Sequence, residues 1–150
     1  MSGEQDLIKL YSQRILALAA SIPRTERLVN PDASVKKRAP LCGSNVTVDL
    51  VLRDGRIVDY GQDVKACALG QAAASVVGTN AVGCDLGDIT KARNSLLNML
   101  KNDGPPPAAP FDALEVLLPA RDYKNRHASI MLALEATLEA FEAAQKTRCA

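Results

Sequence analysis

The sequence lacks several features that would assign it to a common class of protein. No apolar run approaches the ~20 residues that a helix needs to cross a bilayer, and the start "MSGEQDLIKLYSQ" lacks the basic and apolar segments of a secretory signal. There is no glycine-rich phosphate loop and no nucleophile elbow. We therefore expect an intracellular, cytoplasmic protein that is neither a membrane protein nor an enzyme of these classes.

The numbers of basic and acidic side chains are nearly equal. The chain has 18 basic and 17 acidic side chains, which are interspersed and leave a formal net charge of +1. This pattern does not predict binding to nucleic acid or to an anionic membrane. Only Lys36, Lys37 and Arg38 are adjacent, which is typical of a solvated strand or loop. With 150 residues, 47% of them hydrophobic, residues 1–150 are expected to form a single domain.

Cysteines are few, at positions 42, 67, 84 and 149. Because an intracellular compartment keeps thiols reduced, these four residues are not expected to form a disulfide framework. A metal, cluster or catalytic role is favoured instead.

The apolar pattern of the first half predicts a helix followed by a small antiparallel sheet. Apolar residues recur every three or four positions over residues 5–20, and Pro23 ends this helix. Residues 45–64 alternate as in a hairpin, with Asp54 and Gly55 in its tight turn. Residues 34–39 form a third extended segment that could pair alongside.

The second half predicts helices that cover one face of this sheet. An alanine-rich helix runs from Cys67 to Gly78, where small side chains allow close packing against the sheet. A second helix has Asp88 as its N-cap and stops at Gly104. Residues 104–110, "GPPPAAP", form a loop, and a last helix begins near His127. The fold class is therefore α+β, with a three-stranded antiparallel sheet packed against several helices.

Three potential ligands fall at the ends of these elements. Cys42 enters the first hairpin strand, Cys67 begins a helix, and His127 begins the last helix. A thiolate at a helix N-terminus faces unpaired backbone N–H groups, which lower its pKa, so Cys67 is the best candidate for a reactive thiol. The spacings alone match no zinc-finger pattern.

These segments resemble the NifU/IscU-type iron–sulfur cluster assembly scaffolds. The resemblance rests on Cys42-Gly43-Ser44, on "DGRIVDYGQDVKACALGQAAASVV" and on "RHASIMLALEA", and it extends from "LYSQRIL" to the last helix. It implies an α+β scaffold, not an enzyme, that accepts sulfur from a cysteine desulfurase, assembles a [2Fe-2S] cluster and passes it to recipient apoproteins. It also implies that Cys42, Cys67 and His127 are ligands of the cluster or of zinc.

The sequence departs from the family pattern at two positions. Ala128 stands where the family has its third cysteine, and Ser44 stands where it usually has an aspartate. Alanine offers no ligand and a hydroxyl is a poorer one than a carboxylate. We expect Cys84 to be an ordinary buried residue and Cys149 to lie in a frayed tail.

Three functions remain open at this point. The first is a scaffold or carrier that holds a cluster transiently at Cys42, Cys67 and His127, with an external thiol or a second copy in a homodimer completing the ligands. The second is a sulfur-relay protein, with zinc at the site, in which Cys67 accepts persulfide sulfur. The third is a binding module that has kept the fold and lost the metal.

Overall fold

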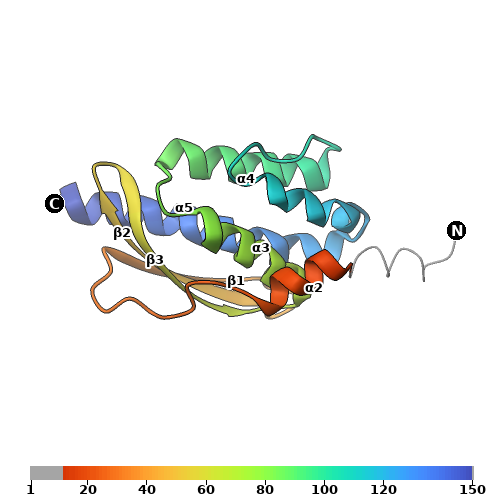
Figure 1. The fold of residues 1–150 in the computed structure, drawn as a ribbon, viewed down its shortest axis with the longest axis horizontal. Coiled ribbons are helices and arrows are strands. Elements are labelled where there is room, and N and C mark those ends of the chain that lie inside the picture. Colours follow the sequence, from red (N-terminus) through yellow and green to blue (C-terminus); the bar gives the residue numbers. More distant parts are fainter. Residues whose placement is uncertain (1–11, 150) are drawn as a thin grey trace, which may run out of the picture.

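The computed structural model describes residues 12–149, which form a sheet covered on one face by helices (Figure 1). The elements in chain order are α2 (Gln13–Ala20), β1 (Ala33–Arg38), β2 (Asn45–Arg53), β3 (Arg56–Lys65), α3 (Ala68–Asn80), α4 (Leu86–Lys101), the 3-10 helices η1 (Asp112–Asp122) and η2 (Lys124–Arg126), and α5 (His127–Cys149). The three strands are antiparallel in the order β1-β2-β3. The α+β prediction with a three-stranded antiparallel sheet is therefore confirmed. None of the helices described is long and apolar enough to cross a bilayer.

The hairpin forms at the residues whose alternating apolar and polar pattern predicted it. Val46, Val48, Leu50 and Leu52 all point into the core from β2 and are at most 4% exposed. Asp54 and Gly55 both have positive φ, at 53° and 75°, as a two-residue type I′ turn requires. The third strand, expected over residues 34–39, pairs with β2 over Ala33–Arg38.

Helices α3 and α5 lie side by side on the inner face of the sheet, and α4 packs on α5. Two glycines of α3 allow this close packing. A Cβ at Gly78 would collide with Gln62 of β3, and one at Gly70 would lie 2.5 Å from the Ser129 hydroxyl of α5. The small residues of α3 thus bring the helix close to the sheet, as predicted, and also close to α5.

Other helix boundaries need correction. The N-cap of α4 is Asp85 and not Asp88, because the two carboxylates form a reciprocal capping box. Helix η1, which contains Pro119, was not predicted, since 3-10 turns show no 3.6-residue periodicity. The first helix was expected over residues 5–20, and only its part from Gln13 falls within the described residues. Leu7, Leu10 and Tyr11, which are among the apolar residues that predicted this helix, lie outside them.

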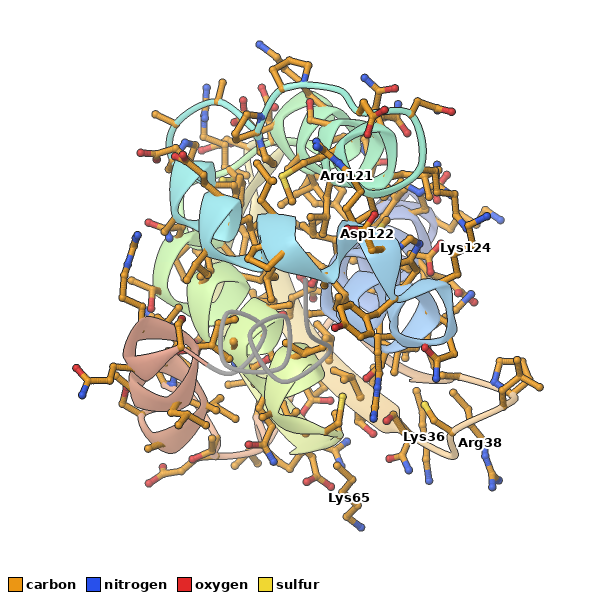
Figure 2. All side chains as sticks on the ribbon, turned by 90° about the vertical axis from the view of Figure 1, so that its right-hand side faces the viewer. Lys36, Arg38, Lys65, Arg121, Asp122 and Lys124 are labelled. Atoms are coloured by element: carbon orange, nitrogen blue, oxygen red, sulfur yellow. The ribbon has the colours of Figure 1, made fainter. Side chains whose placement is uncertain are left out.

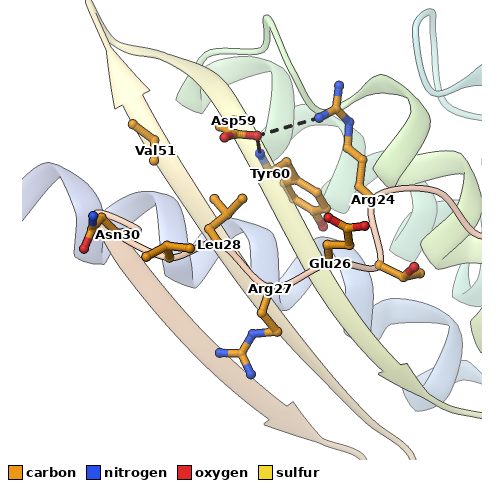
Figure 3. A pocket seen from close by; sticks show the side chains of 10 residues that line it. Arg24, Glu26, Arg27, Leu28, Asn30, Val51, Asp59 and Tyr60 are labelled. Atoms are coloured by element: carbon orange, nitrogen blue, oxygen red, sulfur yellow. Dashed lines mark hydrogen bonds and ion pairs between the residues drawn. The ribbon is translucent and has the colours of Figure 1, made fainter.

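The segment over residues 24–30 crosses the outer face of the sheet (Figure 3). It is held there by Asp49 of β2, whose side chain is fully buried and accepts bonds from Arg27 at 2.6 and 3.0 Å. Asp49 also accepts bonds from the Ser34 hydroxyl and the Leu28 N–H. A pocket between this segment and the sheet is lined partly by Asp59 and contains none of the cysteines.

Candidate functional site

One end of the sheet gathers the chain segments that carry the predicted site. Arg38 of β1 pairs with Asn45 of β2, and Asn45 pairs with Lys65 of β3. The loop over residues 39–44 and the connection from β3 to α3 therefore lie next to each other. Helix α5 packs on β1 and β2 and on α3, and Figure 2 shows the molecule from this end.

Cys42 is exposed in a tight loop between β1 and β2. The Gly43 N–H donates to the Ala39 carbonyl at 3.1 Å, and Gly43 has a φ of +73°, which glycine adopts without strain. The thiol Sγ lies 3.2 Å from the Ser44 hydroxyl. Hydrogen bonding to Ser44 lowers the pKa of Cys42, and the positive charge of Arg126 contributes further.

Cys67 is the N-cap residue of α3 and is partly buried. Burial opposes ionisation of its thiol, but the Ser129 hydroxyl, 3.5 Å away, and the N–H groups of Gly70 and Leu69 outweigh this effect. Together with the charge of Arg126 they lower the pKa of Cys67. The predicted position of Cys67 at a helix N-terminus is confirmed.

Two buried serines connect the two thiols. The Ser129 hydroxyl donates to the Ser44 hydroxyl at 3.2 Å, so that contacts run from Cys42 through Ser44 and Ser129 to Cys67. Ser44 was noted in the sequence as the residue at the aspartate position, whereas Ser129 was not predicted. The signal for Ser129 was its place in "RHASIMLALEA", the segment that begins with Arg126. Arg126, which favours both thiolates, was missed as well.

His127 begins α5 as predicted, but the structure does not place its imidazole with the two thiols. His127 is 3% exposed, and its Nε2 donates to the carbonyls of Ala120 and Arg121 at 3.0 and 3.1 Å. Successive helical residues turn by about 100°, so residues 127 and 129 point about 200° apart. Since Ser129 faces the thiols, His127 faces away, and Ala128 is exposed to solvent. The described residues contain no group of three or more cysteine, histidine or acidic side chains arranged to hold a metal ion.

The other two cysteines do not join this site in the described structure. Cys84 is 4% exposed, its thiol donates to the Asn80 carbonyl at 3.3 Å, and burial with Asp88 and Asp85 nearby raises its pKa to about 11. Cys84 is thus the ordinary buried residue that was expected. The side chain of Cys149 falls outside what the structure describes.

Removal of the Ser129 hydroxyl is expected to make Cys67 a poorer thiolate. The Ser129→Ala variant loses the hydrogen bond that favours the charged form, so the pKa of Cys67 should rise. The pH dependence of iodoacetamide alkylation, read for each cysteine by mass spectrometry, would show the Cys67 midpoint at higher pH and a several-fold slower reaction near neutral pH. Cys84 provides a slow internal reference. An unchanged Cys67 midpoint would contradict the assignment of Ser129.

Comparison with known proteins agrees with the fold. Neither a family model nor a curated protein sequence matches the chain. Among solved structures, the N-terminal part of a nitrogen-fixing NifU-like protein from Brucella abortus is 39% identical, with a TM-score of 0.92 over 94% of this chain and 98% of that one.

A putative iron–sulfur cluster assembly scaffold protein for the SUF system of Fervidobacterium islandicum is 17% identical, with a TM-score of 0.80 over 89% of this chain and 98% of that one. A hypothetical protein is also 17% identical with a TM-score of 0.80, over 90% of this chain and 98% of that one. These two likenesses show the fold alone, whereas the first identity extends over nearly the whole chain.

Proposed function

The chain belongs to the NifU N-terminal-like family of iron–sulfur cluster assembly scaffolds, and from this premise we propose that it holds a cluster, or the iron for one, transiently at Cys42 and Cys67. The cluster is cargo and not a resident cofactor. It would be built with sulfur from a cysteine desulfurase and passed to recipient apoproteins. A scaffold binds and transfers its cargo, so we assign it no catalytic reaction.

The pair of activated thiols carries this proposal. Thiolate is the form of cysteine that binds iron, and the pKa values of both Cys42 and Cys67 are lowered by their neighbours. Both thiols lie at the same end of the sheet, where Ser44 and Ser129 connect them. Cys42 is exposed and Cys67 partly buried, so a bound cluster would remain accessible to a protein that receives it.

The ligand set within one chain is incomplete. A [2Fe-2S] cluster is usually held by four protein ligands, and this site supplies two thiolates beside two hydroxyls, which are weak ligands for iron. His127 could contribute only after its ring leaves the Ala120 and Arg121 carbonyls. We therefore propose that an external thiol or a second copy of the chain completes the shell, which makes the cluster labile and easily transferred.

A second candidate function is sulfur relay through Cys67, favoured by its place at the N-terminus of α3. The Cys67 thiolate would attack the outer sulfur of a persulfide R–S–SH on the desulfurase. The S–S bond of the donor breaks, the donor leaves as a thiolate R–S⁻, and Cys67 becomes the persulfide Cys–S–SH. The step needs no oxidant, since one sulfur–sulfur bond forms as another breaks. Zinc, bound through the same thiolates, would hold the site between transfers.

The content of iron, sulfide and zinc in protein purified without oxygen tests these proposals. We expect iron with acid-labile sulfide, retained through gel filtration after anaerobic reconstitution. Stoichiometric zinc without sulfide would favour sulfur relay. Protein that retains neither metal before or after reconstitution would overturn the cluster carrier and the zinc-bound relay, and would leave the metal-free binding module in front.

A further inference from the structure

Two thiols and two hydroxyls lie in a row at the end of the sheet. The Cys42 Sγ is 3.2 Å from the Ser44 Oγ, which is 3.2 Å from the Ser129 Oγ. The Ser129 Oγ is in turn 3.5 Å from the Cys67 Sγ. Both serines are buried, with 6% and 1% of their surface exposed. Serine hydroxyls bind metal ions in other proteins, so these oxygens are potential ligands as well as links between the thiols.

The spacing of the four atoms is close to the edges of a tetrahedral metal site. With metal–sulfur bonds of about 2.3 Å and metal–oxygen bonds of about 2.0–2.2 Å, tetrahedral angles separate sulfur from oxygen by about 3.5–3.7 Å and oxygen from oxygen by about 3.3–3.6 Å. The sulfur–oxygen contacts here are 3.2 and 3.5 Å, and the oxygen–oxygen contact is 3.2 Å. Hydroxyls that bond only to each other are usually about 2.7–2.8 Å apart. Three edges of a tetrahedron are therefore close to the required length.

The Ser129 hydroxyl is turned toward this row and away from its own helix. Thr79 and Thr137 each donate to the carbonyl four residues earlier, which is the common bond of a hydroxyl within a helix. Ser129 donates to Ser44 instead. Gly70 of α3 provides the room, because a Cβ there would lie 2.5 Å from the Ser129 hydroxyl. The packing of α3 on α5 thus presents this oxygen to the thiols.

The start of α5 offers residue 129 to the thiols, and not the two residues before it. The His127 imidazole donates to two carbonyls of η1, and Ala128 is exposed and has no donor atom in its side chain. The family resemblance puts a ligand at one of these two positions. In this chain the contact with Cys67 comes from Ser129.

We propose that Ser129 takes the place of the missing third ligand, so that two thiolates and two serine oxygens hold one divalent transition-metal ion in a tetrahedral site. The inference rests on the proposed function, since this ion is the iron for a cluster. On binding, the two thiol protons leave to water and the two thiolates balance the charge of the ion. Hydroxyl oxygens are poor ligands beside thiolates, so the ion is held loosely and is easily passed on.

A third thiol placed at either of two positions of α5 tests the proposal. Ser129→Cys adds a thiol to the row of donors. Ala128→Cys is the matched control, because it restores the cysteine of the family pattern at an exposed position. The probe is cobalt(II), added without oxygen and with neither iron nor sulfide. Its visible bands report tetrahedral coordination, and its sulfur-to-metal charge-transfer absorption grows with the number of thiolates bound.

We expect tetrahedral cobalt with two thiolates in wild type and in Ala128→Cys. Ser129→Cys should show a charge-transfer absorption about half as large again and bind cobalt about tenfold more tightly or better. Ser129→Ala should bind about tenfold more weakly than wild type, at a pH where Cys67 is ionised in both proteins. This variant decides the matter if the larger sulfur at position 129 disturbs the packing at Gly70, which circular dichroism would show.

Equal gains in the two cysteine variants, or a gain confined to Ala128→Cys, would overturn the proposal, because the third ligand would then come from position 128. Unchanged cobalt affinity in Ser129→Ala would overturn it too. Cobalt binding requires no sulfide, so it is decided separately from the proposed function. Wild type that binds cobalt as expected but retains no iron and sulfide after reconstitution would contradict the proposed function and support the site. A retained cluster with no effect of Ser129→Ala on cobalt would do the reverse.

Discussion

A Cys67→Ala variant is expected to lose essentially all of the iron and sulfide that the wild-type protein retains after anaerobic reconstitution. It removes one of the two thiolates that the chain supplies, so the effect should exceed the roughly 10–100-fold loss that removal of an outer partner of a metal ligand causes. Iron and acid-labile sulfide would be measured after gel filtration without oxygen. Retention at the wild-type level would place the cluster elsewhere.

In this experiment, loss of a cluster ligand can be distinguished from loss of the fold. As a neutral thiol Cys67 makes no capping hydrogen bond to α3, and the N–H groups of Gly70 and Leu69 favour only its charged form. Its removal should therefore leave the helix intact, as circular dichroism would show. Cys84→Ala is the matched control, because it removes a buried thiol remote from the serine pair. His127→Ala should keep its iron and sulfide, since the imidazole bonds to Ala120 and Arg121. Loss of the cluster in that variant would restore His127 as a ligand.

The predictions from sequence hold where local pattern decides the structure. The alternation from Val46 to Leu52, the turn at Asp54 and Gly55, and the helix that follows Cys67 each depend on residues close in the chain. The predicted N-cap of α4 was three residues too late. Asp85 and Asp88 are the two partners of a capping box, and the sequence alone does not tell which aspartate is the N-cap and which is the third helical residue.

The composition of the site depends instead on contacts between distant segments. Ser129 meets Ser44 across 85 residues of sequence, and only the close packing of α3 on α5 at Gly70 brings its hydroxyl to Cys67. His127 lies in the correct segment, but the rotation of α5 about its axis decides which residue faces the thiols. That rotation follows from which residues of the whole helix are buried, and a motif match does not contain it.

A second large effect is expected at the outer face of the sheet, where Arg27→Met should destabilise the fold by about 2–3 kcal/mol. The side chain of Asp49 is fully buried, and the variant would leave its charge with only the Ser34 hydroxyl and the Leu28 N–H as partners. The expected cost is below that of a fully buried pair because Arg27 is 52% exposed, so water can take part of its place. Urea denaturation near neutral pH would measure the difference.

Lys37→Met provides the control for this variant. Lys37 forms an ion pair with Glu139 at 3.2 Å in which the side chains are 38% and 55% exposed. Exposed pairs of this kind contribute at most about 1 kcal/mol. Equal destabilisation by the two variants would show that burial of Asp49 does not govern the strength of its ion pair.

The destabilisation by Arg27→Met should depend on pH, because the pKa of Asp49 differs between the folded and unfolded states. Burial of Asp49 opposes its ionisation, but Arg27, Ser34 and the Leu28 N–H outweigh burial and hold the pKa of the carboxyl below its ordinary value. The stabilisation is therefore complete above the unfolded-state pKa of about 3.9 and is lost as the pH falls through the lower folded-state pKa. Arg27→Met raises that folded-state pKa, so its deficit relative to wild type should be full near neutral pH and shrink below about pH 4. If the difference in the free energy of unfolding between variant and wild type stayed constant below pH 4, the loss would come from the packing of the arginine stem and not from its charge.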